Sequence, residues 1–322
     1  MPRKAPFRKY MDKYLEKKRN RSLSTRQTYR KWLLELEGTA RSIGLTRTPT
    51  SWTLEDIVLL LEARGFREDG IPRANTTVRN EIGLLSRYLK FIGNYELDTA
   101  LEDGEIRKPP DTKAYRRWKT LEDVIALRAT ARALGDNIAL ITMQLALDAY
   151  LRVSEIANLD LINIQGTTIQ VLRGKGRKDR QVEITERTRL DIDLFIMEPR
   201  ADILKGRRHD RLMVHTQRGF PSGYSSSSLS HRVREVGKAC QPPIAVSPHD
   251  LRRTGAQLTY IANPTDRTVR DLQAALGHSN TEQTREYIGA GVVDQRKTIT
   301  ARDRYFEKLY PEEFSQSPLA RY

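Results

Sequence analysis

The sequence has almost no cysteine and no long apolar run, and these absences exclude several classes of protein. Cys240 is the single cysteine among 322 residues, so no disulfide can form within the chain and a reducing cytosol is expected. The first residues show no signal-peptide pattern, and no run approaches the roughly 20 apolar residues that a membrane-spanning helix requires. The sequence therefore predicts a soluble cytoplasmic protein without a membrane partner.

Metal and nucleotide sites are not expected either, because the residues that would form them lack the required spacing. His209, His215 and His231 stand apart from any cysteine or carboxylate cluster with the spacing of zinc ligands. The basic turn around Lys175 lacks the G-x-x-x-x-G-K-[ST] pattern of a phosphate-binding loop. The sequence therefore predicts no metal ion, no nucleotide and no other cofactor.

The chain has fewer acidic than basic residues, and the excess of basic residues is concentrated near the N-terminus. The chain has 56 Lys and Arg residues against 41 Asp and Glu, a formal net charge of +15. Residues 1–31 alone carry twelve basic side chains against Asp12 and Glu16, a local balance of +10. Such a balance favours a polyanionic partner, nucleic acid or an anionic membrane. The membrane alternative is weak, because the apolar side of this segment lacks bulky anchoring residues.

Helical periodicity dominates the chain, and its length favours two domains. A small helical bundle is expected over residues 1–105, and adjacent prolines predict a linker over 106–115. The second domain would span 116–322, with a tail from residue 290 onward. The helices expected in the first domain lie at about 6–19, 23–42, 53–64 and 76–92.

The second domain is expected to be helical as well, except for one β-hairpin. Two short alternating segments, TTIQVL and RQVEI, flank the glycine-rich basic sequence RGKGRKD, which predicts a hairpin with a basic turn. The pattern Ser247-Pro248 predicts a capped helix start. The expected fold is therefore mainly helical with a small β-sheet. The helices expected here lie at about 120–134, 137–150, 186–198, 225–239, 247–258 and 265–276, with a short one from 281.

Six residues of this second domain have the chemistry needed to transfer a DNA phosphodiester onto a phenol without a metal ion. They are Arg152, Lys175, His249, Arg252, His278 and Tyr287. Each has an ordinary alternative by itself, such as a helix-terminal arginine, a solvated hairpin lysine, a capping histidine or a half-buried tyrosine. His249 and Arg252 are three residues apart and would share one face of a helix, but that pair alone is weak evidence.

The sequences around these six residues form four boxes in a fixed order. The boxes are Leu151-Arg152-Val153-Ser154-Glu155-Ile156, a G-K-G-x-K-x-R segment from Gly174 to Arg180, His249-Asp250-Leu251-Arg252, and Leu276-Gly277-His278 nine positions before Tyr287. Together they resemble the catalytic boxes of the tyrosine recombinase (phage integrase) family. The resemblance covers about 120–290 well, and covers 1–105 only in general character.

The resemblance implies a helical core-DNA-binding domain followed by a mainly helical catalytic domain with a small sheet. It also implies that Arg152 and Arg252 bind the scissile phosphate, to which a planar guanidinium can offer two hydrogen bonds. Tyr287 would be the nucleophile and would form a phosphotyrosyl link to the 3′ end of the DNA.

Four further side chains receive roles from the resemblance or from their position. His249 would accept the proton of the attacking tyrosine, and Lys175 would protonate the departing 5′ oxygen. His278 would donate a hydrogen bond to the phosphate. Glu155, one turn after Arg152, is placed to orient the site, and a surface ion pair is the equal alternative.

The activity implied is site-specific recombination of double-stranded DNA at an inverted-repeat core site. A homotetramer would hold two DNA sites and exchange strands through a Holliday junction at the nucleoid, without ATP and in some cases with an accessory protein. A type IB topoisomerase and a DNA-binding relative that has lost catalysis remain alternatives. Among recombinases, both a Xer-like resolver and a mobile-element integrase remain open, and the start of the chain close to the core-binding domain favours the Xer-like architecture.

Three positions depart from the family pattern. Arg253 stands where many relatives have a second histidine, and Tyr150 where many have glycine. Ile288-Gly289-Ala290 follow Tyr287, where Thr-His is frequent. None of these departures removes a proposed catalytic group. The amphipathic pattern at 301–309 would form a C-terminal helix that packs either on a neighbouring protomer or on its own domain.

Overall fold

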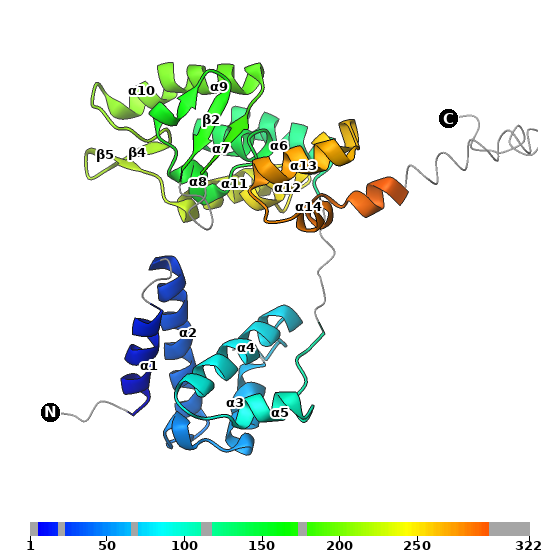
Figure 1. Ribbon diagram of the computed structural model, residues 1–322. Helices are drawn as coiled ribbons and strands as arrows, with labels where there is room; N and C mark the ends of the chain where they lie inside the picture. Colours follow the sequence, from blue (N-terminus) through cyan, green and yellow to red (C-terminus); the bar gives the residue numbers. More distant parts are fainter. Residues whose placement is uncertain (1–5, 19–22, 66–69, 111–117, 173–178, 296–322) are drawn as a thin grey trace, which may run out of the picture. The chain divides into compact units, whose positions relative to one another are not determined.

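The structure is a computed structural model that describes residues 6–18, 23–65, 70–110, 118–172 and 179–295. The chain divides into two compact units, Met1–Arg116 and Arg117–Tyr322, and each is described by itself (Figure 1). Across the described ranges, none of the helices combines the length and the apolar content that a membrane span requires.

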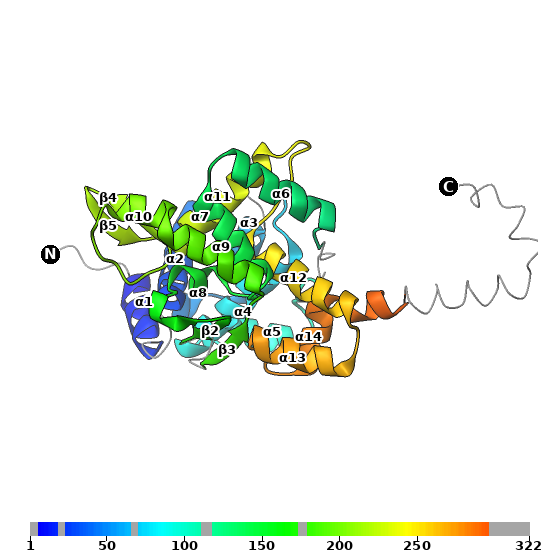
Figure 2. The same cartoon turned by 90° about the horizontal axis from the view of Figure 1, so that it is seen from above.

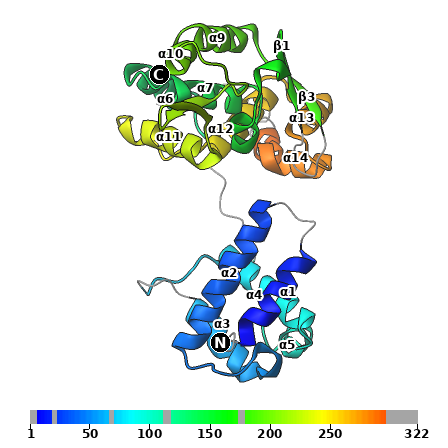
Figure 3. The same ribbon diagram turned by 90° about the vertical axis from the view of Figure 1, so that its left-hand side faces the viewer.

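The first unit is a bundle of helices in which α1 and α2 lie side by side (Figure 3). Its core contains Tyr14, whose ring meets that of Tyr88 edge to face at a centroid distance of 5.4 Å. The buried ion pair of Arg64 with Glu81, at 2.6 Å, joins α3 to α4. The helices are α1 (Pro6–Lys17), α2 (Leu23–Ser42), α3 (Leu54–Arg64), α4 (Asn75–Phe91) and α5 (Glu96–Glu102), with a 3-10 turn at Pro49–Ser51.

The central element of the second unit is α7 (Asn137–Leu147), which is buried along almost its whole length. Four helices make the most extensive contacts with it (Figure 1). A helix surrounded in this way needs an apolar sequence on all sides, and NIALITMQLAL meets that need. The four neighbours are α6 (Leu121–Ala133), α9 (Glu186–Met197), α11 (Ser226–Ala239) and α12 (Pro248–Ala262).

Two small antiparallel sheets lie at the edges of this helical layer. The first has the order β1-β2-β3, and β2 pairs with β3 so that Ile169 faces Val182. The second is the hairpin β4–β5, which lies beside α10, at the end of the unit away from α13 and α14 (Figures 1 and 2). The strands are β1 (Ile164–Gln165), β2 (Thr168–Val171), β3 (Arg180–Glu183), β4 (Val214–Gln217) and β5 (Phe220–Gly223). The remaining helices are α8 (Val153–Ala157), α10 (Pro199–Leu204), α13 (Asp266–Leu276) and α14 (Thr281–Ile288), with a 3-10 turn at Leu161–Asn163.

The predicted mainly helical fold with small sheets is confirmed, and the helix starts agree closely with the capping signals. Thr53, Thr120 and Ser247 each cap a helix and complete a capping box. The prediction was wrong at the end of α7, which stops at Leu147 rather than near Tyr150, because Tyr150 has a left-handed backbone with φ of 50°. The short elements β1, β4, β5, α5, α8 and α10 were not predicted, and Arg152 lies at the start of α8 rather than at the end of an apolar helix.

Candidate active site

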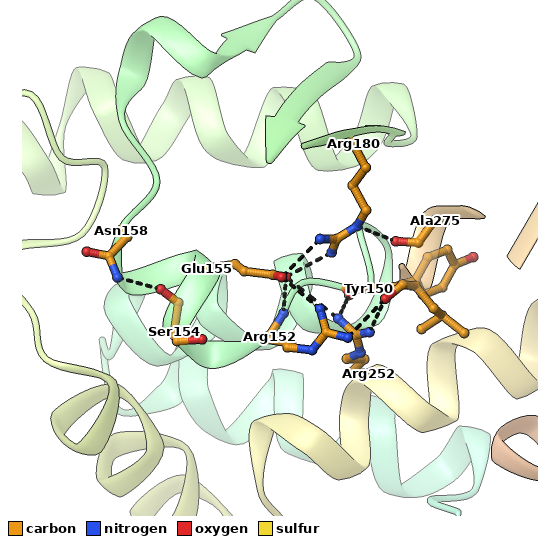
Figure 4. Close-up of polar contacts among 9 residues, drawn as sticks. Tyr150, Arg152, Ser154, Glu155, Asn158, Arg180, Arg252 and Ala275 are labelled. Atoms are coloured by element: carbon orange, nitrogen blue, oxygen red, sulfur yellow. Dashed lines mark hydrogen bonds and ion pairs between the residues drawn. The ribbon is translucent and has the colours of Figure 1, made fainter. Parts of the chain in front are cut away.

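Glu155 lies at the centre of a cluster of three arginine side chains (Figure 4). Its carboxylate accepts two hydrogen bonds from the guanidinium of Arg180, at 2.9 and 2.8 Å, and one from the guanidinium of Arg152 at 2.9 Å. An ion pair with Arg252 at 3.7 Å completes the cluster. Burial alone would raise the pKa of this carboxyl, but the hydrogen bonds and charges of Arg180 and Arg152 lower it to about 2. Glu155 is therefore a permanent anion that holds the three cations together.

Arg152 occupies the position just before α8, where its backbone is extended. Its backbone N–H donates to the carboxylate of Glu155 at 2.8 Å, which satisfies one of the free amides at the helix start. Its guanidinium donates to Glu155 and to the carbonyl oxygen of Leu276 at 3.2 Å. The side chain remains 24% exposed, so the remaining N–H groups of the fork can reach a ligand.

Arg252, on α12, is the most deeply buried cation of the cluster, with 1% of its side chain exposed. It donates to the carbonyl oxygen of Tyr150 and, at 2.7 Å, to that of Leu276. Burial and the neighbouring charge of Arg152 lower the pKa of Arg252 to about 10. The guanidinium therefore stays charged at neutral pH, and two backbone carbonyls together with Glu155 determine its orientation.

The C-terminal end of α13 supplies the acceptors that align these arginines. The carbonyl oxygen of Ala275 accepts from Arg180 at 2.7 Å, and that of Leu276 accepts from both Arg152 and Arg252. Helix C-termini carry free carbonyl groups and partial negative charge, so they bind cations well. Gly277 ends the helix with φ of 65°, a conformation that glycine adopts without strain.

Tyr150, one of the departures from the family pattern, has an unusual backbone conformation. Its φ of 50° lies in the left-handed region, where a side chain costs roughly 1–2 kcal/mol. This conformation accompanies the hydrogen bond from Arg252 to the carbonyl oxygen of Tyr150. The phenol forms a hydrogen bond of 2.6 Å with the hydroxyl of Thr259 on α12, which compensates in part for the backbone strain.

Helix α12 presents three cationic or titratable side chains on one face. It begins with Ser247 as cap and Pro248 as its first residue, and a proline there loses no helical hydrogen bond. His249, Arg252 and Arg253 then occupy positions i, i+3 and i+4, which are neighbours on a helix surface. The capped start therefore determines how all three side chains are directed.

Tyr287, on α14, lies buried where this face of α12 meets the turn after α13. Only 6% of the residue is exposed. Its ring meets His278 edge to face at 5.0 Å and His249 at 5.7 Å, and the guanidinium carbon of Arg253 lies 5.3 Å from its centroid. His278 is itself held by a hydrogen bond of 3.1 Å between its Nδ1 and the hydroxyl of Thr284. The structure thus brings the late tyrosine, both histidines and the arginine pair together.

Burial and nearby charges shift the pKa values of the tyrosine and of its neighbouring histidine. Burial raises the pKa of Tyr287, and the charges of Arg252, Arg253 and Arg152 act in the opposite direction. Partial burial lowers the pKa of His249, and the charges of Arg253 and Arg252 lower it further. His249 is therefore neutral near pH 7 and can accept a proton.

Three polar atoms at this place have no hydrogen-bond partner among the described residues. They are the hydroxyl oxygen of Tyr287 and the Nε atoms of Arg252 and Arg253, and all three are buried. Single atoms of this kind also occur elsewhere among the described residues, but here three of them belong to side chains that lie together, so a ligand bound at this place could use them. The ligand that this set suits is an anion, because two of the three atoms belong to guanidinium groups.

One predicted residue, one predicted segment and one residue that was not predicted complete the description. Lys175 and the segment 301–309 lie outside the described residues, although the strands β2 and β3 that flank the turn of Lys175 form the predicted hairpin. The sequence did not indicate a role for Arg180. Its contacts in the site are with Glu155 and Ala275, which lie far from it along the chain. In the ranges that the structure covers, no group of three His, Cys, Asp or Glu side chains could hold a metal ion.

The site lies within a stretch that matches a known family. The sequence profile of the phage integrase family matches residues 120–291, more than half of the chain. The chain is 25% identical to tyrosine recombinase XerC of Bacillus subtilis (strain 168) over 94% of its own length and 98% of that protein. It is 29% identical to tyrosine recombinase XerA of Pyrococcus horikoshii over 68% of its length and 70% of that protein.

The fold is also similar to solved structures of DNA complexes. A lambda integrase dimer (residues 75–356) bound to a COC′ core site matches with a TM-score of 0.61 at 17% identity, over 87% of this chain and 94% of that one. The Tn1549 transposon integrase in complex with circular intermediate DNA matches with a TM-score of 0.58 at 19% identity, over 87% and 94%. At these identities the likeness supports the fold of both units.

Proposed function

Because this chain belongs to the phage integrase family of tyrosine recombinases, enzymes of site-specific DNA recombination, we propose that Tyr287 is its nucleophile. The observation that carries the proposal is the meeting of Tyr287 with Arg252, His249 and His278, where buried donors remain without partners. The remaining roles follow from the positions of these groups.

Arg152 and Arg252 bind the two non-bridging oxygens of the scissile phosphate. Negative charge grows on these oxygens as the tyrosine attacks, and a positioned guanidinium lowers the energy of that transition state by several kcal/mol. Because Glu155 and the carbonyl oxygen of Leu276 already align both side chains, little reorganisation is needed when DNA binds. Glu155 acts through these arginines as a positioning residue.

The reaction exchanges one phosphodiester bond for another. The hydroxyl oxygen of Tyr287 bonds to phosphorus while its proton passes to neutral His249, and the bond from phosphorus to the 5′ oxygen breaks. Lys175 gives a proton to that oxygen, a general-acid role for a lysine on a hairpin. The phosphotyrosine formed at the 3′ end conserves the energy of the broken bond, so that religation needs neither ATP nor a metal ion.

His278 assists by donating a hydrogen bond to the phosphate. The hydroxyl of Thr284 donates to the carbonyl oxygen of Asn280 at 3.3 Å, so it accepts from the Nδ1–H of His278 at 3.1 Å. The donor to the phosphate is then Nε2 of the protonated ring, in which both ring nitrogens donate. The edge-to-face contact with Tyr287 at 5.0 Å places this ring next to the nucleophile. The imidazole therefore approaches the phosphate beside the tyrosine.

The domain assignment extends the same proposal to the whole chain. Residues 1–105 form the core-DNA-binding domain, 106–115 the linker, and 116–322 the catalytic domain with the tail 290–322. The division between Arg116 and Arg117 and the excess of basic residues near the N-terminus support this assignment. A homotetramer would act at the nucleoid on two DNA sites with inverted-repeat cores, and the Xer names of the relatives favour a Xer-like resolver over a mobile-element integrase.

Covalent trapping tests the proposal. The protein is incubated with fragmented DNA from its source, denatured, and the DNA that stays attached is sequenced. We expect adducts at one inverted-repeat sequence that disappear in Tyr287→Phe and persist in Tyr224→Phe, a matched change on a tyrosine beside His215 at the far hairpin. Adducts without sequence preference would instead indicate a topoisomerase, and the absence of adducts would indicate a DNA-binding relative without catalysis.

A further inference from the structure

Arg253 is a departure from the family pattern that lies in direct contact with the proposed nucleophile. Its guanidinium carbon lies 5.3 Å from the ring centroid of Tyr287, within the range of a cation–π interaction. The side chain is only 13% exposed, so water screens this contact weakly. A histidine at the same position would carry a full charge only at acidic pH.

The other contacts of Arg253 leave its charge available to the ring. Its one ion pair with a described residue, Asp250, is long at 3.9 Å. Asp250 uses its other oxygen to accept hydrogen bonds from the backbone and the hydroxyl of Ser247, at 2.9 and 2.7 Å, as part of the helix cap. The Nε of Arg253 is buried without a hydrogen-bond partner in the part of the chain that the structure describes.

The same charge acts on both partners of the proposed proton transfer. Arg253 favours the ionised form of Tyr287, and after burial it makes the largest contribution to lowering the pKa of His249. An ionised phenol and a neutral imidazole are the forms needed by a nucleophile and its base. Among the residues that the structure describes, the charged or titratable groups that face Tyr287 or His249 are Arg252, Arg253 and Asp250 on α12, Arg152 before α8, and His278 before α14.

We propose that Arg253 is a positioning residue that holds the ring of Tyr287 for attack and keeps His249 ready to accept its proton. The inference rests on the proposed role of Tyr287 as nucleophile. It assigns to a permanently charged arginine a task that a histidine could perform only when protonated. The enzyme should consequently cleave DNA over a wider range toward acidic pH than a variant with an uncharged residue at this position.

The first test measures the rate of covalent adduct formation against pH, with enzyme in excess over a DNA substrate nicked so that religation is prevented. In Arg253→Gln, removing the charge raises the pKa of Tyr287 and of His249, so less phenolate and less neutral imidazole exist at a given pH. We expect the acidic limb of the profile to move up by about one pH unit, the effect of one partly buried charge at this separation. Arg253→Lys keeps the charge and should restore the position of the limb, with a lower plateau because the planar contact is lost.

Arg187→Gln is the matched control, since it removes the charge of an exposed arginine that pairs with Asp191 on α9. Its profile should coincide with that of the unchanged protein. Tyr287→Phe is run beside these variants. Adduct formation that persists in Tyr287→Phe would contradict the proposed function, whereas an Arg253→Gln profile lowered at every pH without a shift would contradict the inference alone.

A second measurement needs no catalysis and therefore separates the two proposals. The chain has five histidines, so the imidazole signals can be followed by NMR during a pH titration, and His249→Ala identifies the signal of interest. We expect the pKa of His249 to rise by about one unit in Arg253→Gln and to return toward its original value in Arg253→Lys. An unchanged titration of His249 in both variants would overturn the inference even if Tyr287 is the nucleophile.

Discussion

Glu155 combines two requirements that usually conflict, because it is buried and yet must remain ionised. A buried carboxylate loses hydration, and three guanidinium groups replace that hydration here. Removing one partner of a buried ion pair typically costs about 3–5 kcal/mol, since the other partner is left uncompensated. The unfolding free energy of the second unit at acidic pH should therefore depend on this single side chain.

The first prediction concerns Glu155→Gln, which preserves shape and removes the charge. At pH 7 we expect the catalytic unit to lose about 3 kcal/mol of unfolding free energy, because three cations then repel one another. The folded pKa of Glu155, about 2, lies below its unfolded value of 4.5, so protons bind preferentially to the unfolded chain. Its stabilisation is fully present above pH 4.5 and is lost as the pH falls through 2.

Urea denaturation followed by circular dichroism between pH 2 and 7 measures this effect. The unchanged protein should lose stability across that window, and Glu155→Gln should lack this part of the pH dependence. Glu235→Gln is the control, since Glu235 pairs with Lys238 on the exposed side of α11 and should leave stability little changed. Identical acid profiles for Glu155→Gln and the unchanged protein would show that the carboxylate is not stabilised by its partners.

Sequence reasoning at the residue scale was strongest where the signal is local. Glu155, one turn after Arg152, was predicted either to orient the site or to form a surface ion pair, and it forms a buried contact with Arg152 at 2.9 Å. The contact of Glu155 with Arg180 could not be predicted, because it joins side chains 25 residues apart across a hairpin. The left-handed conformation of Tyr150 was also hidden, since a tyrosine gives no signal of positive φ.

At the scale of the element, α12 depends on a close approach to α7. Gly255 lies in the middle of α12, where a glycine usually weakens a helix by up to about 1 kcal/mol. A Cβ atom there would lie 1.9 Å from the backbone carbonyl oxygen of Leu147. The glycine is therefore required by packing, and periodicity could predict both helices but not the distance between them.

The second prediction concerns Gly255→Ala, which forces α12 away from α7. The obstacle is backbone and cannot move cheaply, so we expect a loss of about 3 kcal/mol in unfolding free energy. Since α12 also carries His249 and Arg252, the rate of DNA cleavage should fall together with stability. Gly291→Ala, at an exposed position with open space around it, should leave both quantities nearly unchanged. Thermal unfolding of the two variants measures this difference in stability. Equal midpoint temperatures for Gly255→Ala and Gly291→Ala would contradict the packing argument.

For the whole molecule, the net charge of +15 is expected to determine how strongly the affinity for DNA depends on salt. Each phosphate neutralised on DNA releases counterions, so affinity falls as salt rises, with a slope set by the number of phosphate contacts. Composition alone already predicted a polyanionic partner. It could not predict which cations contact the scissile phosphate, because that depends on how α8, α12 and α13 come together.

The third prediction measures this dependence in the Tyr287→Phe background, where binding reaches equilibrium without cleavage. If 6–10 phosphates are contacted, affinity for the core site should fall by roughly 10³–10⁵ between 50 and 200 mM salt. Adding Arg152→Gln removes one phosphate contact and should lower the slope by about one, equally for specific and unrelated DNA. Adding Arg187→Gln instead, on the exposed face of α9, should leave the slope unchanged. A slope unaffected by Arg152→Gln would mean that Arg152 does not bind phosphate, whereas equal losses from both variants would mean that net charge alone governs binding.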